Sequence, residues 1–328
     1  MKNKRQASKP RTSQGQTSGK KVRYRISNWS DYNESLVQRG SITLWINTED
    51  LGSWKPEDYP KRGGQRQYSD GAIQCLLMVR SFFHLPLRAT EGFVRSVFQL
   101  MNLEFGVPDY TTICKRSKYL AVVLPRQAKG PLHAVLDSTG LKVFGEGEWK
   151  VRQHGYSKRR TWRKLHLSVD SGSQEIQAVV LSEAGQDDAG VVPELLDQME
   201  EPIAQLSGDG AYDKRKVYQA CRERGITRVT IPPRKDARIW QHGNCLAPPL
   251  VRDENLRQIR QQGRKRWKQE SGYHQRSLAE TAMFRFKTLF GPNLQSRRMP
   301  QQQTEAKVKC AALNRITHLG MPVSYRVA

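Results

Sequence analysis

Residues 136–145 read LDSTGLKVFG and continue an apolar run that begins at Leu132. Residues 132–136 predict a short buried strand, and Asp137 comes directly after it. The tripeptide 138–140 predicts a break, after which residues 141–144 are strand-like again. A lone Asp after a strand is weak evidence for a site, because capping and turn roles are commoner for this residue. Whether Asp137 belongs to a functional site therefore depends on the segments that follow it in the sequence.

The segments after Asp137 alternate between strand and helix patterns. We predict strands at 162–169, 175–181, 203–207 and 228–231, and helices at 189–199, 214–224 and 273–290. The order from residue 132 is therefore three strands, helix, strand, helix, strand, helix. This α/β order matches the ribonuclease-H-like fold of retroviral-integrase type. In that fold one acid lies on the first strand, a second follows the fourth strand and a third lies on a late helix. Asp137, Asp209 and Glu280 occupy those three places.

Three convergent carboxylates suit the cleavage of a phosphodiester. The reaction needs an activated water or hydroxyl and a stabilised leaving oxygen, and two metal ions about 3.5–4 Å apart provide both. Mg²⁺ prefers hard oxygen ligands such as carboxylates. We therefore predict a Mg²⁺ site formed by Asp137, Asp209 and Glu280, which would accept Mn²⁺ as a substitute.

The last predicted helix carries the most specific pattern. Tyr273, Arg276, Glu280 and Lys287 lie at offsets of 0, 3, 7 and 14, which fall within an arc of about 60° on an α-helix. The opposite side is apolar and can pack on the sheet; it carries Leu278, Ala282, Phe286 and Leu289. The pattern predicts an acid flanked by cations that grip phosphates. The alternative is an ordinary amphipathic helix with an Arg276–Glu280 ion pair.

The charge of the chain indicates a polyanionic partner. Its 328 residues include 55 Lys and Arg against 31 Asp and Glu, which gives a formal net charge of +24. A surplus of this size favours nucleic acid, although a merely basic surface would have the same composition. A membrane is disfavoured, because the sequence contains no long apolar run. The five cysteines are dispersed and form no CxxC pair, which argues against zinc and disulfides and for a cytoplasmic location.

The N-terminal part divides into an arm and a helical region. Residues 1–25 contain nine Lys or Arg and no acid, which predicts a disordered basic arm or a solubilising tail. Residues 26–130 predict three short helices, the last capped by Asp109. These helices resemble a helix-turn-helix DNA-binding domain, but any three-helix bundle with a basic face fits equally. The third helix offers as DNA contacts Thr111, Thr112, Lys115 and Arg116.

Two further basic segments lie within the predicted catalytic domain, residues 131–322. Residues 234–270 are polar, and we expect an insertion or mobile loop that meets DNA; a solvated linker is the alternative. The second segment, which contains residues 158–160, follows the second strand-like stretch of the domain. The candidate DNA contacts in these segments are Arg264, Lys265, Arg266, Lys158, Arg159 and Arg160.

Four stretches of the sequence resemble the DDE transposases of bacterial insertion sequences. LDSTGLKVFG (136–145) and LSGDGAYDKR (206–215) look like the first and second acidic blocks, and TWRKLHLSVD (161–170) is similar to the strand between them. YHQRSLAETAMFRFKTLFG (273–291) has the Tyr-Arg-Glu-Lys signature and looks closest to the insertion-sequence-five family. The resemblance covers about residues 131–320, and that to the N-terminal part is looser.

The resemblance implies an enzyme that binds the terminal inverted repeats of its element, cleaves beside them and joins the 3′ hydroxyls to target DNA. Asp137, Asp209 and Glu280 would hold the metals, Arg276 and Lys287 would bind phosphates, and Tyr273 would stack on a base or bond a phosphate. Pairing of two ends implies self-association on DNA. The resemblance to bacterial insertion-sequence enzymes also implies a location at the bacterial nucleoid.

Other roles and readings stay open from the sequence. Asp187 or Asp188 is a candidate fourth acid, although a helix N-cap is the commoner role. We expect His166 to be a core or supporting residue rather than a metal ligand. A ribonuclease-H-like nuclease or resolvase shares the three acids but does not join strands. A non-catalytic DNA-binding protein derived from a transposase is the second alternative, and the intact acids speak against it.

Overall fold

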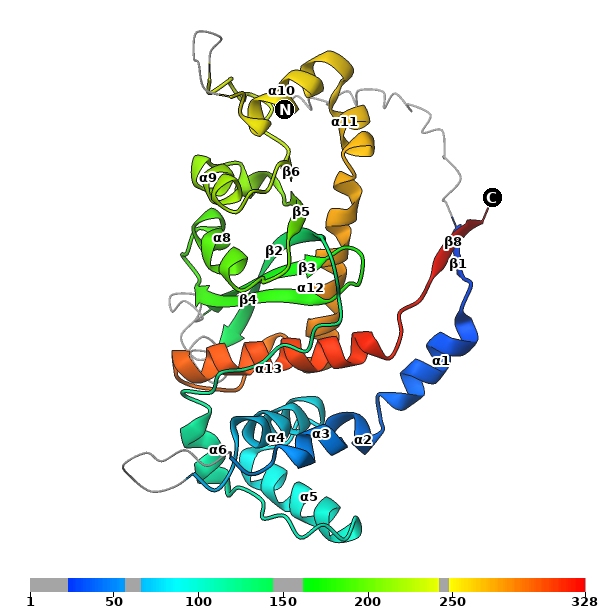
Figure 1. Cartoon of the computed structure of the whole chain (residues 1–328), viewed down its shortest axis with the longest axis vertical. Coiled ribbons are helices and arrows are strands. Elements are labelled where there is room, and N and C mark those ends of the chain that lie inside the picture. Colours follow the sequence, from blue (N-terminus) through cyan, green and yellow to red (C-terminus); the bar gives the residue numbers. More distant parts are fainter. Residues whose placement is uncertain (1–22, 57–65, 144–161, 242–247, 328) are drawn as a thin grey trace, which may run out of the picture.

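The computed structural model describes residues 23–56, 66–143, 162–241 and 248–327. In these residues a central sheet has helices on both faces, and a group of N-terminal helices packs beneath it (Figure 1). This mixed α/β architecture fits the ribonuclease-H-like fold that the order of strands and helices predicted. Lys158, Arg159 and Arg160 lie outside the described residues, as does most of the predicted basic arm.

The sheet follows the predicted order of strands. Its strands run in the spatial order β4-β3-β2-β5-β6, with the two-residue β7 also paired to β2. The first three strands are antiparallel neighbours, while β5 lies parallel to β2 and β6 parallel to β5. The strands are β2 (Leu132–Val143), β3 (Trp162–Asp170), β4 (Ile176–Glu183), β5 (Ile203–Ser207), β6 (Arg228–Thr230) and β7 (Asn293–Leu294).

The two faces of the sheet belong to different apolar clusters. Side chains alternate along β2, so Leu132, Ala134 and Leu136 pack with α8 (Asp188–Asp197) and α9 (Arg215–Glu223). Val135 and Leu141 face the other way and pack with α12 (Ser277–Phe290) and α13 (Met299–His318). The odd-numbered positions of β2, which include Asp137, therefore face α12.

The N-terminal helices include the three that we predicted. Ser69 caps α4 (Asp70–Phe82) by accepting a hydrogen bond from Ala72 N–H, α5 (Leu87–Leu100) follows, and Asp109 caps α6 (Tyr110–Arg116). Their relation to a helix-turn-helix module remains a prediction. The remaining N-terminal elements are β1 (Arg23–Ile26), α1 (Trp29–Gln38), α2 (Ile42–Trp45) and α3 (Thr48–Gly52).

Helix α13 joins these helices to the sheet, and no pattern in the sequence predicted it. One apolar cluster contains Ile73 and Leu76 of α4, Val308 of α13 and Val179 of β4. Figure 1 shows α13 lying between the sheet and the N-terminal helices. The predicted boundary at residue 130 thus runs through a shared core in the described part of the chain.

Three local expectations were wrong. Strand β2 runs without a break through residues 138–140, because residues 134–142 pair continuously with β3. Residues 251–270 are not a mobile loop but two helices, α10 (Val251–Gln262) and α11 (Arg264–Glu270), in which Trp267 is buried. Residues 23–26, expected in part to be a disordered arm, form β1 and pair with β8 (Ser324–Val327).

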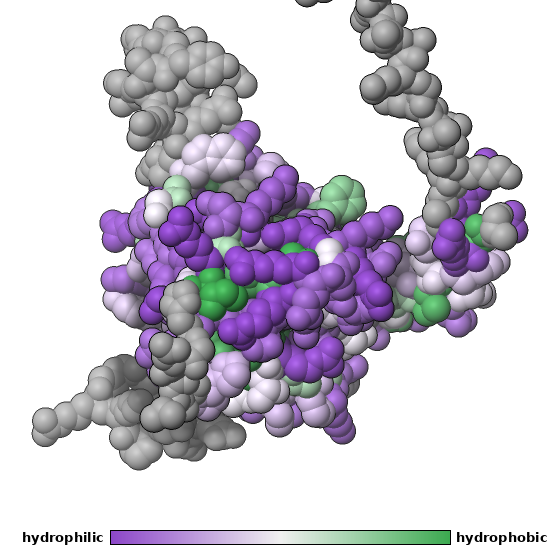
Figure 2. Space-filling view, turned by 90° about the horizontal axis from the view of Figure 1, so that it is seen from above, coloured by the Kyte–Doolittle hydropathy of each residue, from purple (hydrophilic) through white to green (hydrophobic). Residues whose placement is uncertain are grey.

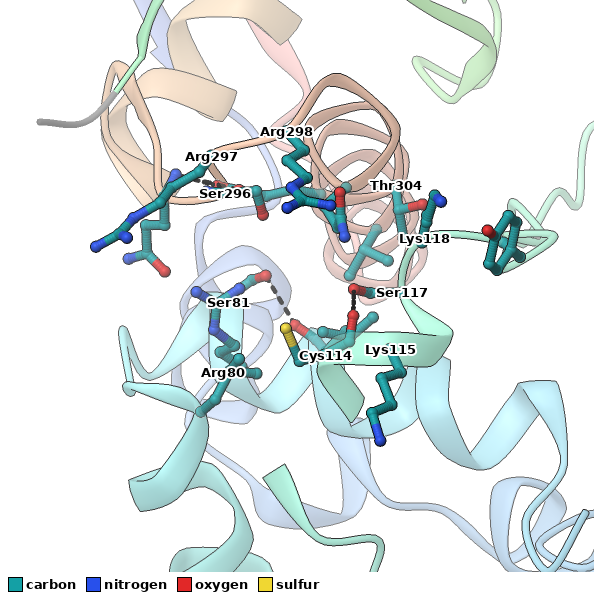
Figure 3. Close-up of a pocket in the computed structure, with 17 residues that line it drawn as sticks. Arg80, Ser81, Cys114, Lys115, Ser117, Lys118, Ser296, Arg297, Arg298 and Thr304 are labelled. Atoms are coloured by element: carbon teal, nitrogen blue, oxygen red, sulfur yellow. Dashed lines mark hydrogen bonds between the residues drawn. The ribbon is translucent and has the colours of Figure 1, made fainter. Parts of the chain in front are cut away.

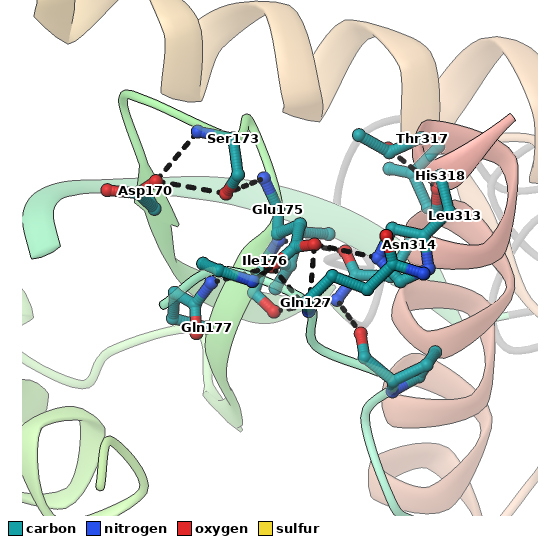
Figure 4. Close-up of polar contacts among 12 residues, drawn as sticks. Gln127, Asp170, Ser173, Glu175, Ile176, Gln177, Leu313, Asn314, Thr317 and His318 are labelled. Carbon is teal, nitrogen blue, oxygen red and sulfur yellow. Dashed lines mark hydrogen bonds and ion pairs between the residues drawn. The ribbon is translucent and has the colours of Figure 1, made fainter. Parts of the chain in front are cut away.

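Two buried polar residues tie α13 to the sheet and to the connection that leads into β2 (Figure 4). Asn314 accepts a hydrogen bond from Ile176 N–H (2.8 Å) and donates to the carbonyls of Pro125 and Ile176, both at 2.9 Å. Glu175 accepts from Gln127 N–H (3.0 Å) and contacts His318 Nε2 (2.7 Å). These bonds hold together three segments that are distant in sequence.

We expect Asn314→Ala to lower the free energy of unfolding by about 2–4 kcal/mol, because it leaves a buried N–H and two carbonyls without their partner. Denaturant unfolding monitored by tryptophan fluorescence measures the change. Lys307→Ala, on the same helix but partly exposed, is the control and should change it by less than about 0.5 kcal/mol. Equal effects of the two variants would contradict the bridging role of Asn314.

Candidate active site

Asp137 and Asp209 lie side by side because β2 and β5 pair in parallel. Val135 of β2 is the register partner of Ser207 of β5. Asp137 comes two residues after Val135, and Asp209 comes two residues after Ser207. Parallel neighbours lie about 4.8 Å apart, and positions two residues apart share a face. The register therefore directs both carboxylates to the α12 face of the sheet. Asp137 lies within β2, whereas Asp209 follows the end of β5, as predicted.

A buried tyrosine lies beneath the second acid. Asp209 caps a short 3₁₀ turn (Gly210–Tyr212) by accepting a hydrogen bond from Ala211 N–H (2.9 Å). A Cβ on Gly208 would come within 2.9 Å of the Tyr212 ring, so only glycine lets this ring pack against the chain here. Burial raises the pKa of Tyr212, and so do the charges of Asp188, Asp137 and Asp209. The sequence analysis did not single out Tyr212, although it lies in the quoted second acidic block.

The third acid comes from α12. Glu280 is exposed and forms an ion pair with Arg276 one turn earlier. The predicted helix start was too early, because Tyr273–Arg276 form a 3₁₀ turn and α12 begins at Ser277. Two cations lie near the ring of Tyr273, with Lys268 Nζ 4.8 Å and the Arg276 guanidinium 5.9 Å from its centroid. The Arg276–Glu280 pair, which we considered as the alternative reading of this helix, is thus present.

Lys287 reaches the same strand as the first acid. Its Nζ donates to the Thr139 hydroxyl at 2.6 Å, and Thr139 is two residues beyond Asp137 on the same face of β2. The apolar side of α12 is buried as the sequence predicted, through Ala282 and Phe286. The cationic end of the signature therefore lies next to the acids in this structure.

The Asp137 carboxylate lies within electrostatic range of Asp209 and Glu280. Burial raises the pKa of Asp137; a hydrogen bond from Ser138 N–H (2.9 Å) and the Arg276 charge lower it, and the charges of Asp209 and Glu280 raise it further. Like charges gathered at a half-buried position are unfavourable without a cation to balance them. Arg276 and Lys287 supply part of that balance.

The chemistry of these donors fits a divalent cation. Carboxylate oxygens are the ligands that Mg²⁺ and Mn²⁺ accept, and the raised pKa of Asp137 is the mark of a carboxylate that lacks full compensation. In the described part of the chain no three His, Cys, Asp or Glu side chains converge closely enough to hold an ion as they stand. Glu280 is turned to Arg276 instead.

The candidate fourth acids differ in their surroundings. Asp187 is the N-cap residue of α8, without a side-chain capping bond, and pairs with Lys214 and Lys216, both at 2.5 Å. Asp188 lies inward, where one oxygen contacts Lys164 Nζ (2.8 Å) and the other lies 3.3 Å from Nδ1 of the fully buried His166. Of the two candidate fourth acids, Asp188 is therefore the one that lies near Tyr212 and the site.

The predicted DNA contacts on α6 are partly used within the protein. The hydroxyls of Thr111 and Thr112 bond to the capping carboxylate of Asp109 (2.5 and 2.7 Å). Arg116 pairs with Asp70 and donates to the carbonyl of Tyr68. Lys115 is exposed.

The contacts predicted on α11 lie at its exposed side. Arg264 donates to the carbonyl of Pro233 (2.7 Å), and Arg266 pairs with Glu270 (2.6 Å). Lys265 is exposed. Seen from the α10 and α11 end of the molecule, the surface is dominated by hydrophilic side chains (Figure 2).

The comparison with protein families agrees with this fold and these motifs. Residues 128–315 match the model of a transposase DDE domain, and residues 37–146 match a second model with the same description. The first match spans more than half of the chain and contains Asp137, Asp209 and Glu280. The chain therefore belongs to the DDE transposase family. No helix in the described residues combines the length and apolar character that crossing a membrane requires.

His166 makes the fold sensitive to acid. Burial lowers its pKa to about 4, so the folded protein binds this proton less readily than the unfolded chain, and stability falls as the pH drops from about 6.5 towards 4. We expect the wild type to lose about 2 kcal/mol between pH 7.5 and 5 from this group. Urea unfolding at the two pH values should show a smaller loss in His166→Gln. The same loss in both proteins would contradict this.

Proposed function

We propose that the protein is a DNA transposase that binds the terminal inverted repeats of an insertion sequence, cleaves beside them and joins the 3′ hydroxyls to target DNA. One observation carries the proposal: acids from β2, from the end of β5 and from α12 lie on one face of the sheet, within electrostatic range of one another. The insertion-sequence-five family, suggested by residues 273–291, is the subgroup we propose.

Asp137, Asp209 and Glu280 would hold the metal. A bound divalent ion, Mg²⁺ or Mn²⁺, would supply activation of the attacking oxygen and stabilisation of the leaving one. Glu280 would hold the cation in place of its ion pair with Arg276, whose guanidinium would then bind a phosphate.

The cations of α12 would orient the substrate. Lys287, held by Thr139 beside the acids, supplies a charge for a phosphate oxygen near the scissile bond. Tyr273, near Lys268 and Arg276, would stack on a base or bond a phosphate oxygen. These residues bind and position; the carboxylates account for the chemistry.

The surroundings of the site suit a long DNA substrate. The net charge of +24 is the electrostatic basis for contacts with many phosphates. We assign recognition of the element's ends to residues 26–130, with Lys115 and the threonines of α6, and contacts beside the site to Lys265 and Arg266 on α11. Joining of two ends requires self-association on DNA.

A nuclease of the same fold is the second candidate. The Tyr-Arg-Glu-Lys set on α12 and the 3₁₀ turn before it favours the transposase, because strand joining requires the first cleaved end to stay bound while a second DNA is attacked. Incubation of the full chain with end DNA, a target plasmid and Mg²⁺ separates the two. Joined products support the transposase, whereas cleaved ends without joining support the nuclease.

We expect Asp137→Ala, Asp209→Ala and Glu280→Ala each to reduce cleavage by at least about a thousandfold, since each removes a ligand whose electrostatic role is worth about 4 kcal/mol or more. Binding of the same DNA should be unchanged or slightly tighter, because a negative charge is lost. Nicking of labelled end DNA in Mg²⁺ and a gel-shift assay measure the two quantities.

Asp197→Ala is the matched control, an exposed acid on α8 away from the three acids. It should cleave as the wild type does. Cleavage within tenfold of the wild type by any one of the three site variants would remove that residue from the assignment.

The salt dependence of binding tests the phosphate contacts. If about eight phosphates are neutralised, log K should fall against log salt with a slope near −7. Replacing the seven Lys and Arg of residues 2–21 by Gln should make the slope shallower and weaken binding to all sequences alike. Fluorescence anisotropy with end and scrambled duplexes measures both. A slope that these replacements leave unchanged would exclude the arm from DNA binding.

A further inference from the structure

A cavity of about 600 Å³ lies between the N-terminal helices and the start of α13, away from the three acids. Arg80 and Ser81 reach it from α4, and Cys114 and Lys115 from α6 (Figure 3). Residues 295–298, which precede α13, close the opposite side. None of the residues assigned to cleavage lines it.

The cavity is cationic. Five cationic side chains and one acidic side chain line the cavity. Of the cationic residues, Arg297, Arg298 and Lys115 are exposed, and Lys118 is partly buried. No ion pair of these four side chains occurs among the described residues. The cationic residues are Arg80, Lys115, Lys118, Arg297 and Arg298.

The charge of the single acid, Glu305, offsets that of Arg80 only in part. Glu305 is buried and pairs with Lys309 Nζ at 2.7 Å. Its carboxylate also accepts hydrogen bonds from Gln295 N–H (2.9 Å) and Ser296 N–H (2.8 Å). Glu305 is therefore already compensated and shapes the rim by holding residues 295 and 296 in place.

Arg80 is the least compensated group of the cavity. Its Nε is buried, and no acceptor for it exists among the described residues. Burial lowers the pKa of its guanidinium, and the nearby charge of Glu305 offsets this effect only in part, so a cost remains for keeping the charge out of water. An anion in the cavity would offset that cost and accept hydrogen bonds from the guanidinium.

We propose that this cavity binds a backbone phosphate of DNA, with Arg80, Arg298 and Lys118 around the phosphate. The apolar floor, formed by Leu77, Leu87 and Val308, then lies against the adjacent sugar. Phosphate contacts fix the register of a protein on DNA without reading sequence. The inference rests on the proposed function, and it places a DNA anchor on the junction that joins the N-terminal helices to α13.

Cys114 offers a direct probe, because it is an exposed cysteine that lines the cavity, whereas Cys75, Cys221 and Cys310 are buried. The full chain with Cys245→Ser removes the one cysteine outside the described residues. Modification of Cys114 by a maleimide is followed by mass spectrometry in EDTA. Three samples at matched ionic strength are compared: the protein alone, the protein with a duplex of about 40 base pairs, and the protein with pyrophosphate.

We expect the duplex to slow modification of Cys114 at least about fivefold. Protection by pyrophosphate but not by the duplex would identify a site for free phosphate ions and overturn the DNA proposal. Modification at an equal rate in all three samples would overturn it as well. Cleavage assays on the same preparation report separately on the proposed function, since a chain that cleaves end DNA while Cys114 stays fully reactive refutes only the cavity.

The salt dependence gives a second, independent measure. Arg298→Gln, in an exposed residue whose loss should not affect folding, should make the slope of log K against log salt shallower by about 0.9, the value for one phosphate. Arg80→Gln should do the same. Arg222→Gln removes an exposed charge on α9 outside the cavity and is the control. A change in Arg298→Gln no larger than in Arg222→Gln would overturn the proposal.

Discussion

The parallel pairing of β2 with β5 brings two negative charges to neighbouring positions on one face of the sheet. The register of Val135 with Ser207 leaves Asp137 and Asp209 no other arrangement unless the strands slip, and a slip of one residue would turn every side chain of β5 to the opposite face. The apolar residues of β5, such as Leu206, oppose that slip because they are buried in the core. The packing of the sheet thus enforces the proximity of the acids.

The rest of the site compensates for this proximity. Arg276 and Lys287 bring positive charge from α12, and Thr139 orients the lysine. On the other side, Lys164 and His166 surround Asp188, close to the buried Tyr212. A site of this kind stores unfavourable electrostatic energy in the absence of cations, so that binding of metal and phosphate relieves it.

The strands could be predicted from the sequence because they leave strong local signals, whereas the role of the three acids stays a prediction. Apolar runs mark β2 and β5, and the spacing from Glu280 to Lys287 marks one face of α12. Helix α13 escaped prediction because its buried side includes Gln302, Glu305, Lys309 and Asn314, which look like solvent-exposed residues until their partners are known. The same holds for α10, where Arg252 and Asp253 are buried in an ion pair (3.2 Å). Such pairing depends on distant residues and has no local pattern.

The buried polar side of α13 also explains why the two parts of the chain form one packing unit. Asn314 and Glu175 bond to the connection at residues 125–128, while Arg315 pairs with Asp50 near the N-terminal helices (2.8 Å). Polar bonds of this kind specify one orientation, whereas apolar contacts alone tolerate sliding. DNA held by the N-terminal helices would therefore be held at a fixed orientation to the acids on β2 and β5, and a phosphate anchored at the start of α13 would lie on the element that sets that orientation.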